Sequence, residues 1–244
     1  MRVLSVVHDP AATGGGGLFE RVVLERGDHL DRWIVSEGDA APGDPTHWDA
    51  VMVFGGAMHP DQDAEHPWLQ GEVSFIQRAL ADGVPTIGVC LGAQLLARAA
   101  GAWVGPAESA EVGWFAVDVN DEGSSDSVLG VLPRRVEAFQ WHYYTFALPD
   151  GARELARSAT VRQAFRLGER AWGIQFHAEV DRRMLDRWLV MGASELPKPI
   201  DDVRAETDRL LAGWNEHGRA LANAFLDEAR RLASGAPAPA HRYA

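Results

Sequence analysis

The sequence predicts an α/β protein with a central, mostly parallel sheet, antiparallel edge strands and helices on both faces. In the first hundred residues, short apolar runs alternate with segments whose apolar residues recur at helical spacing, which is typical of a parallel sheet covered on both sides. From Val112 onward, strand-like segments follow one another, separated by turn signals such as Asp121-Glu122-Gly123 and Pro149-Asp150-Gly151. We therefore expect antiparallel strands at the edge of a parallel core.

The first half alternates four expected strands with three expected helices. The strands are buried apolar runs at residues 3–8, 33–36, 50–54 and 86–89. The helices are expected at residues 18–26, 68–81 and 91–100, and the second of them carries Leu69, Val73, Ile76 and Leu80 at helical spacing.

The second half predicts further strands and then helices only. The antiparallel strands are expected at residues 114–119, 136–140, 153–159, 163–167 and 171–176. An apolar stripe then predicts one helix, through Met184, Leu185, Trp188 and Leu189, and the region from about 200 to 233 predicts two more. The small residues from Ser234 to Ala240 predict a frayed tail.

This pattern divides the chain into a domain at residues 1–195 and a C-terminal helical extension with its tail at 196–244. Short helices are marginal alone, so the extension must bury its apolar side chains, which include Leu210, Leu211, Leu221 and Phe225. They would pack on the main domain or on a second copy of the chain, which allows a homodimer.

Composition excludes several classes of protein. The 244 residues carry a formal charge of −12, with 46% hydrophobic and 24% charged residues, as in an ordinary globular protein. An acidic surface disfavours nucleic acid as a partner. No apolar run approaches the roughly 18 residues that span a bilayer, so we expect no membrane association and a cytoplasmic location. The single cysteine excludes an internal disulfide and a multi-cysteine metal cluster.

Cys90 lies between two glycines, where an expected strand ends and a helix begins. A nucleophile at such a point sits on a tight turn, and the helix N-terminus favours a thiolate. A small buried hydrophobe would fit the same pattern.

Two further motifs follow expected strands. In an extended segment residues two apart face the same way, so Glu179 can lie alongside His177 and fix its tautomer, as the base of a thiolate nucleophile requires. Gly55 and Gly56 follow the third strand and can turn backbone N–H groups toward an oxyanion. A capped strand end and a plain tight turn are the alternatives. All three motifs meet at the carboxyl ends of strands, where open α/β sheets place their sites.

In this order the motifs carry a family resemblance. Gly88-Val89-Cys90-Leu91-Gly92-Ala93-Gln94, the Gly55-Gly56 turn and Phe176-His177-Ala178-Glu179 resemble the triad-type, class I glutamine amidotransferases, particularly stand-alone proteins similar to the amidotransferase half of GMP synthase. Local likenesses at His66-Pro67-Trp68-Leu69, Glu111-Val112-Gly113-Trp114 and Gln140-Trp141-His142 extend the match over residues 48 to 180. Ala178 departs from the family, which commonly has proline there.

The resemblance implies hydrolysis of the glutamine side-chain amide. Cys90 would form a thioester, His177 would pass a proton to the departing ammonia, and Glu179 would orient His177. The oxyanion donors would be the backbone N–H groups of Gly56 and Leu91. Residues implied to hold the substrate are Gly55, Gln94, Trp141, His142 and Tyr143. This chemistry needs no cofactor and no metal.

The sequence shows no site for an ammonia acceptor. Gly14 to Gly17 form a weak phosphate-cradle candidate that lacks a following Lys-Ser/Thr pair, so a flexible turn is the other interpretation. The ammonia would then go to a separate synthase subunit, or the chain is itself a hydrolase.

Other functions stay open. A γ-glutamyl peptide or amine hydrolase would use the same three residues. An α/β-hydrolase with a cysteine nucleophile would place its acid before the histidine, unlike Glu179. A non-catalytic subunit would be expected to have lost one member of the triad. His59 and His66 lie near acidic residues, but their spacing matches no common metal motif.

Overall fold

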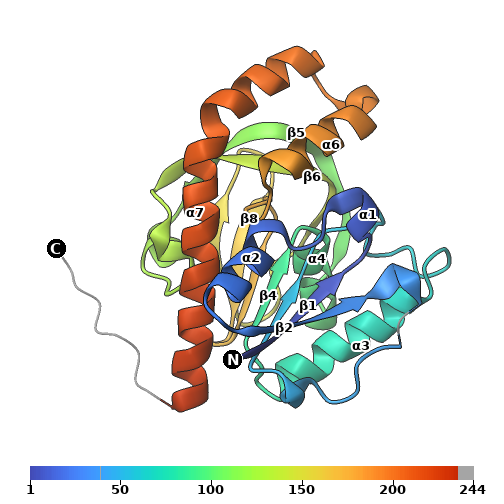
Figure 1. Cartoon of the computed structure of the whole chain (residues 1–244), viewed down its shortest axis with the longest axis vertical. Coiled ribbons are helices and arrows are strands. Elements are labelled where there is room, and N and C mark those ends of the chain that lie inside the picture. Colours follow the sequence, from blue (N-terminus) through green and yellow to red (C-terminus); the bar gives the residue numbers. More distant parts are fainter. Residues whose placement is uncertain (39, 236–244) are drawn as a thin grey trace.

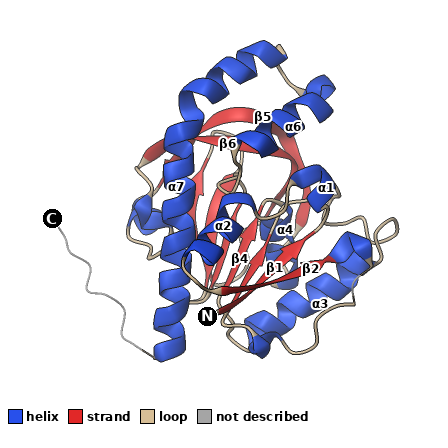
Figure 2. Ribbon diagram, viewed as in Figure 1, coloured by secondary structure: helices blue, strands red, loops and turns tan. Residues whose placement is uncertain are grey.

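A computed structural model describes residues 1–38 and 40–235, in which nine strands form a single curved sheet. Helices cover the sheet, and the longest runs beside it along much of the molecule (Figure 1, Figure 2). The predicted fold class is confirmed.

The parallel half has the strand order β2-β1-β3-β4-β9. Its strands are β1 (Arg2–Val7), β2 (His29–Ile34), β3 (Ala50–Val53), β4 (Thr86–Val89) and β9 (Ala171–Ile174). The prediction placed residues 171–176 among the antiparallel strands, but β9 pairs parallel with β4 and antiparallel only with β8. A buried apolar run does not reveal the direction of its neighbours, so this strand's role as the link between the two halves was missed.

The antiparallel half continues from β9 in the order β8-β7-β5-β6. Its strands are β5 (Val104–Val119), β6 (Arg135–Phe146), β7 (Ala152–Arg157) and β8 (Arg162–Leu167). β5 and β6 are much longer than predicted, and their register shifts between Pro106 and Glu111. The first half of β5 is polar and largely exposed, so only its pairing with β6 marks it as a strand.

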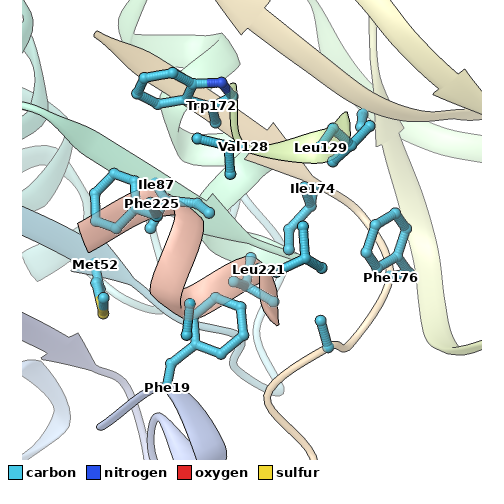
Figure 3. Packing of buried hydrophobic residues seen from close by; sticks show 14 of the residues in the cluster. Phe19, Met52, Ile87, Val128, Leu129, Trp172, Ile174, Phe176, Leu221 and Phe225 are labelled. Carbon is cyan, nitrogen blue, oxygen red and sulfur yellow. The ribbon is translucent and has the colours of Figure 1, made fainter. Parts of the chain in front are cut away.

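Alternate residues of the parallel strands enter two separate hydrophobic clusters. Val3 and Val7 of β1 face the cluster under α2 (Gly17–Glu25) and α7 (Ile200–Ser234). Leu4 and Val6 face the cluster under α3 (Trp68–Ala81) and α4 (Leu91–Ala99). This alternation places helices on both faces of the sheet. In the first cluster, Phe19 of α2 and Phe225 of α7 pack over strand residues that include Met52, Ile87 and Trp172 (Figure 3).

The C-terminal region forms one helix where two were predicted. Residues of α7 stay buried at helical spacing from Val203 through Trp214 to Leu232, so burial holds the helix together across Gly213 and Gly218. Leu211, Leu221 and Phe225 are buried, and Leu210 is partly buried, against the rest of the same chain. The predicted tail lies outside the described residues from position 236 onward.

The remaining elements are short or follow the predictions closely. α6 (Arg182–Met191) follows the loop after β9, whereas α1 (Pro10–Thr13) and α5 (Asp121–Ser124) are single turns that were not predicted. The second strand ends at Ile34 and not at residue 36, because Val35–Glu37 form a 3₁₀ turn. None of the helices in residues 1–38 and 40–235 is long and apolar enough to cross a membrane.

Candidate active site

Cys90 lies on a strained turn between β4 and α4. Its φ of 53° and ψ of −109° make it the one non-glycine residue in positions 1–38 and 40–235 with positive φ, a conformation that costs about 1–3 kcal/mol. The flanking glycines are required by close approach. A Cβ on Gly88 would lie 2.4 Å from the Gly92 carbonyl oxygen, and a Cβ on Gly92 would lie 2.1 Å from the Val53 carbonyl oxygen. The thiol is 6% exposed, and its Sγ lies 3.8 Å from the Trp141 carbonyl oxygen.

His177 and Glu179 form a buried pair in the loop after β9. Nδ1 of His177 lies 2.7 Å from Oε1 of Glu179, as expected for residues two apart in an extended segment. The backbone of the loop is fixed on both sides, because the His177 N–H donates to the Phe139 carbonyl and Trp214 Nε1 donates to the His177 carbonyl at 2.8 Å. The Trp188 ring lies edge-on to the imidazole, with centroids 4.9 Å apart.

Cys90 and His177 meet beside Gly55. A Cβ on Gly55 would lie 3.1 Å from Cε1 of His177 and 3.6 Å from Cβ of Cys90, so this glycine backs onto both side chains. Burial alone would lower the pKa of His177, but the charges of Glu179 and Cys90 and its hydrogen bonds to both raise that pKa well above its ordinary value. The site therefore favours an imidazolium that lies between a carboxylate and a thiolate.

The second glycine of the turn lies against the start of α4. A Cβ on Gly56 would be 2.9 Å from Cδ2 of Leu91. The Leu91 amide belongs to the first turn of α4, where an N–H has no acceptor within the helix. The two amides predicted as oxyanion donors thus belong to neighbouring residues, and both residues line the same pocket as Cys90.

That pocket has a volume of about 620 Å³ and contains all the predicted site residues. The Gln94 side chain donates to the Tyr144 carbonyl at 2.9 Å and to Gln175 Oε1 at 3.2 Å. Trp141 and Tyr143 both donate to Oε2 of Glu195, at 3.1 and 2.7 Å. Burial, followed by the hydrogen bond to Glu195 and its negative charge, raises the pKa of Tyr143 to about 12.

His142 also borders the pocket, but its ring is directed at a different partner. Nε2 lies 3.0 Å from Oε2 of Glu111, and both side chains are buried. Burial would raise the pKa of Glu111, yet the bonds from His142 and Thr160 hold it below its usual range. A role for the His142 side chain in holding substrate stays a prediction.

The glycine run after β1 supports the Cys90 site from behind. The Leu18 N–H donates to the Glu179 carbonyl at 2.7 Å, and a Cβ on Gly17 would lie 2.2 Å from that oxygen. The Leu18 amide that a phosphate cradle would use is therefore already bonded. His59 stacks on Tyr144, and in the described part of the chain no three His, Cys, Asp or Glu side chains are grouped as metal ligands.

Sequence reasoning missed several residues at this site. Trp188 was assigned only to a helix stripe, and Glu195 carried no signal. His8 and Glu72 lie directly behind the Gly55-Gly56 turn. His8 follows β1 at the carboxyl edge of the sheet, so the rule that located the other residues could have found it.

Comparisons with known proteins agree with this geometry. A family model described as glutamine amidotransferase class-I matches residues 31–190. The glutamine amidotransferase-like protein YfeJ of Salmonella typhimurium is 30% identical over 183 residues, which cover 73% of this chain and 76% of that protein. A separate-chain subunit of the glutamine-hydrolyzing GMP synthase of Sulfurisphaera tokodaii is 35% identical over 53% of this chain and 66% of its own length. The matched region of the GMP synthase of Aeropyrum pernix is 37% identical and spans only 25% of its length.

Solved structures resemble the whole chain. A glutamine amidotransferase from Thermotoga maritima superposes with a TM-score of 0.78 at 27% identity, covering 95% of this chain and 97% of that one. A second, from Methylobacillus flagellatus, has a TM-score of 0.84 at 24% identity and covers 100% and 98%, a likeness that concerns the fold alone.

Proposed function

The chain belongs to the class I glutamine amidotransferase family, and we propose that it hydrolyses the side-chain amide of glutamine through a thioester on Cys90, releasing ammonia for a separate acceptor enzyme. The observation that carries the proposal is the buried arrangement of Cys90 on a strained turn, His177 beside it, and Glu179 2.7 Å from the far ring nitrogen of His177.

In the first half-reaction, the Cys90 thiolate attacks the amide carbon and a C–S bond forms. The carbonyl electrons move to oxygen, and the backbone N–H groups of Gly56 and Leu91 stabilise that oxyanion. The imidazolium of His177 then protonates the nitrogen as the C–N bond breaks, so ammonia departs and the thioester remains.

In the second half-reaction, neutral His177 takes a proton from water as the water oxygen attacks the thioester. A second oxyanion forms at the same donors and collapses, the C–S bond breaks, and glutamate leaves. The thiolate and imidazolium are restored. Glu179 holds the Nδ1–H tautomer throughout and stabilises the charged ring.

The amino-acid end of glutamine would lie among Gly55, Gln94, Trp141 and Tyr143, which line the pocket with Cys90. His142 would act there through its place on β6, next to Trp141. No cofactor or metal enters these steps.

A separate synthase subunit is the partner that we propose for the ammonia. Some relatives of similar size are named as one of the subunits of a glutamine-hydrolyzing GMP synthase, which supports an arrangement in which one chain releases ammonia and another uses it. The single cysteine is consistent with a cytoplasmic location for such a pair.

A γ-glutamyl peptide or amine hydrolase is the second candidate, because the pocket is roomy. Its volume of about 620 Å³ lies in the range of roughly 300–1,000 Å³ that accommodates drug-sized ligands. A γ-glutamyl compound with a leaving group larger than ammonia would fit, and the three chemical residues would act unchanged.

A product assay tests the proposal. Purified protein is offered glutamine and a small panel of γ-glutamyl peptides and amines, and glutamate and the released amine are measured. Ammonia and glutamate in equal amounts from glutamine support the main proposal. A clear preference for a γ-glutamyl peptide or amine replaces it with the second candidate.

A further inference from the structure

His8 and Glu72 form a second buried histidine–carboxylate pair, behind the Gly55-Gly56 turn. Nε2 of His8 lies 3.0 and 2.9 Å from the two carboxylate oxygens of Glu72, which comes from α3. Nδ1 of His8 lies 3.1 Å from the Gly55 carbonyl oxygen. Both side chains are completely buried, and neither takes part in the reaction steps above.

Both ring nitrogens of His8 face oxygen acceptors. A neutral imidazole has one N–H and one lone pair, so it would turn a lone pair toward either the Gly55 carbonyl or the carboxylate. Only the doubly protonated ring satisfies both contacts. Burial opposes this charge, but the Glu72 carboxylate and the hydrogen bonds raise the pKa of His8 above its ordinary value.

The bond to Gly55 also determines where the next amide points. The described chain has no cis peptide bond, so the Gly56 N–H points opposite to the Gly55 carbonyl, away from His8. On its other side Gly55 faces His177 and Cys90. A peptide between two glycines rotates easily, and the flipped form would present its carbonyl oxygen to the pocket and repel an oxyanion.

We propose that His8, held by Glu72, is a positioning residue that fixes the Gly55–Gly56 peptide with its N–H directed at the oxyanion formed on Cys90. The inference rests on the proposed function, because that oxyanion arises only if Cys90 attacks a carbonyl group. His8 touches neither substrate nor the reacting atoms, and it acts through one backbone hydrogen bond.

Kinetics of His8→Phe test the proposal. The phenyl ring retains the shape of the imidazole but has no donor, so the peptide is free to flip. Loss of one oxyanion donor lowers kcat by about 10²–10³-fold in other enzymes, and we expect a fall approaching that range with KM for glutamine unchanged. His8→Asn, whose amide N–H can reach the position of Nδ1, should recover much of kcat.

Trp172→Phe is the matched control. It removes a buried bond to the carboxylate of Asp126 at 3.1 Å, which keeps Arg166 as a partner, and Trp172 lies at the start of β9, away from the pocket. It should lower Tm but not kcat. Equal kcat in wild type and His8→Phe, or a fall in the control as large as in His8→Phe, would overturn the positioning role.

A spectroscopic measurement on the wild-type protein keeps the inference separate from the proposed function. ¹⁵N spectra of the histidine rings, with His8 identified through His8→Phe or His8→Asn, should show both nitrogens protonated near neutral pH. A neutral His8 ring would refute the lock, even if the variants do not fold. A doubly protonated His8 in a wild type that hydrolyses no γ-glutamyl compound would instead refute the proposed function.

Discussion

Two glycines of α7 should respond in opposite ways to the same substitution. Gly218 lies against the loop that carries His177, and a Cβ there would be 2.1 Å from the Ala178 carbonyl oxygen. Gly213, one and a half turns earlier, is exposed and has no atom within 4 Å of its Cβ position. Replacing each by alanine therefore compares one methyl group in open space with one in a backbone contact.

The magnitudes follow from these surroundings. In a helix interior, alanine is favoured over glycine by about 1 kcal/mol. Gly213→Ala should gain this amount, which corresponds to about 2–4 °C in Tm for a chain of this size. Gly218→Ala gains the same propensity but adds overpacking of about 1–3 kcal/mol. It also strains the hydrogen bonds from Trp214 to His177 and from Asn215 to Val180, each worth about 0.5–1.5 kcal/mol. We expect a net loss of about 1–4 kcal/mol.

The assay is thermal unfolding of both variants together with their glutaminase kinetics. Gly218→Ala should lower Tm by several degrees and lower kcat, because a shift of α7 moves the backbone of His177; a displacement of about 1 Å can cost about 10²-fold. Gly213→Ala should raise Tm with kcat unchanged. Shifts of Tm in the same direction, or full activity in Gly218→Ala, would refute the claim that α7 supports the site.

Three further substitutions test other parts of the site. Cys90→Gly should raise Tm relative to Cys90→Ala, because glycine adopts a φ of 53° without the strain of about 1–3 kcal/mol; equal Tm values would argue against strain. Glu179→Gln removes a charge that raises the pKa of His177, so activity that needs the imidazolium should be lost at lower pH than in wild type. An unshifted alkaline limb of kcat/KM would contradict this assignment. Tyr143→Phe should remove a phenol that titrates only near pH 12, measured as a missing step in the ultraviolet absorbance.

The local geometry of the site was largely predictable from the sequence. The glycines around Cys90 predicted a tight turn at a strand end, and the structure gives this residue a positive φ. The two-residue spacing of His177 and Glu179 predicted that they face the same way, and their 2.7 Å contact agrees. These inferences rest on neighbours in the chain, whose relative positions are set by backbone geometry.

Features that depend on distant parts of the chain escaped prediction. The parallel pairing of β9 with β4 joins strands about 85 positions apart, and an apolar run does not indicate the direction of its partner. His8 and Glu72 are separated by 64 positions. The unbroken course of α7 across Gly213 and Gly218 depends on burial against the sheet, which overrides weak helix propensity.

The central claim is a covalent glutamyl intermediate on Cys90, and rapid acid quenching followed by mass spectrometry tests it most directly. Wild-type protein mixed with glutamine should carry one glutamyl group on the peptide that contains Cys90, formed and lost at rates that account for the release of glutamate. Cys90→Ala should carry no adduct and release no ammonia while still binding glutamine. Hydrolysis that continued at the wild-type rate in Cys90→Ala protein, without an adduct, would contradict the account.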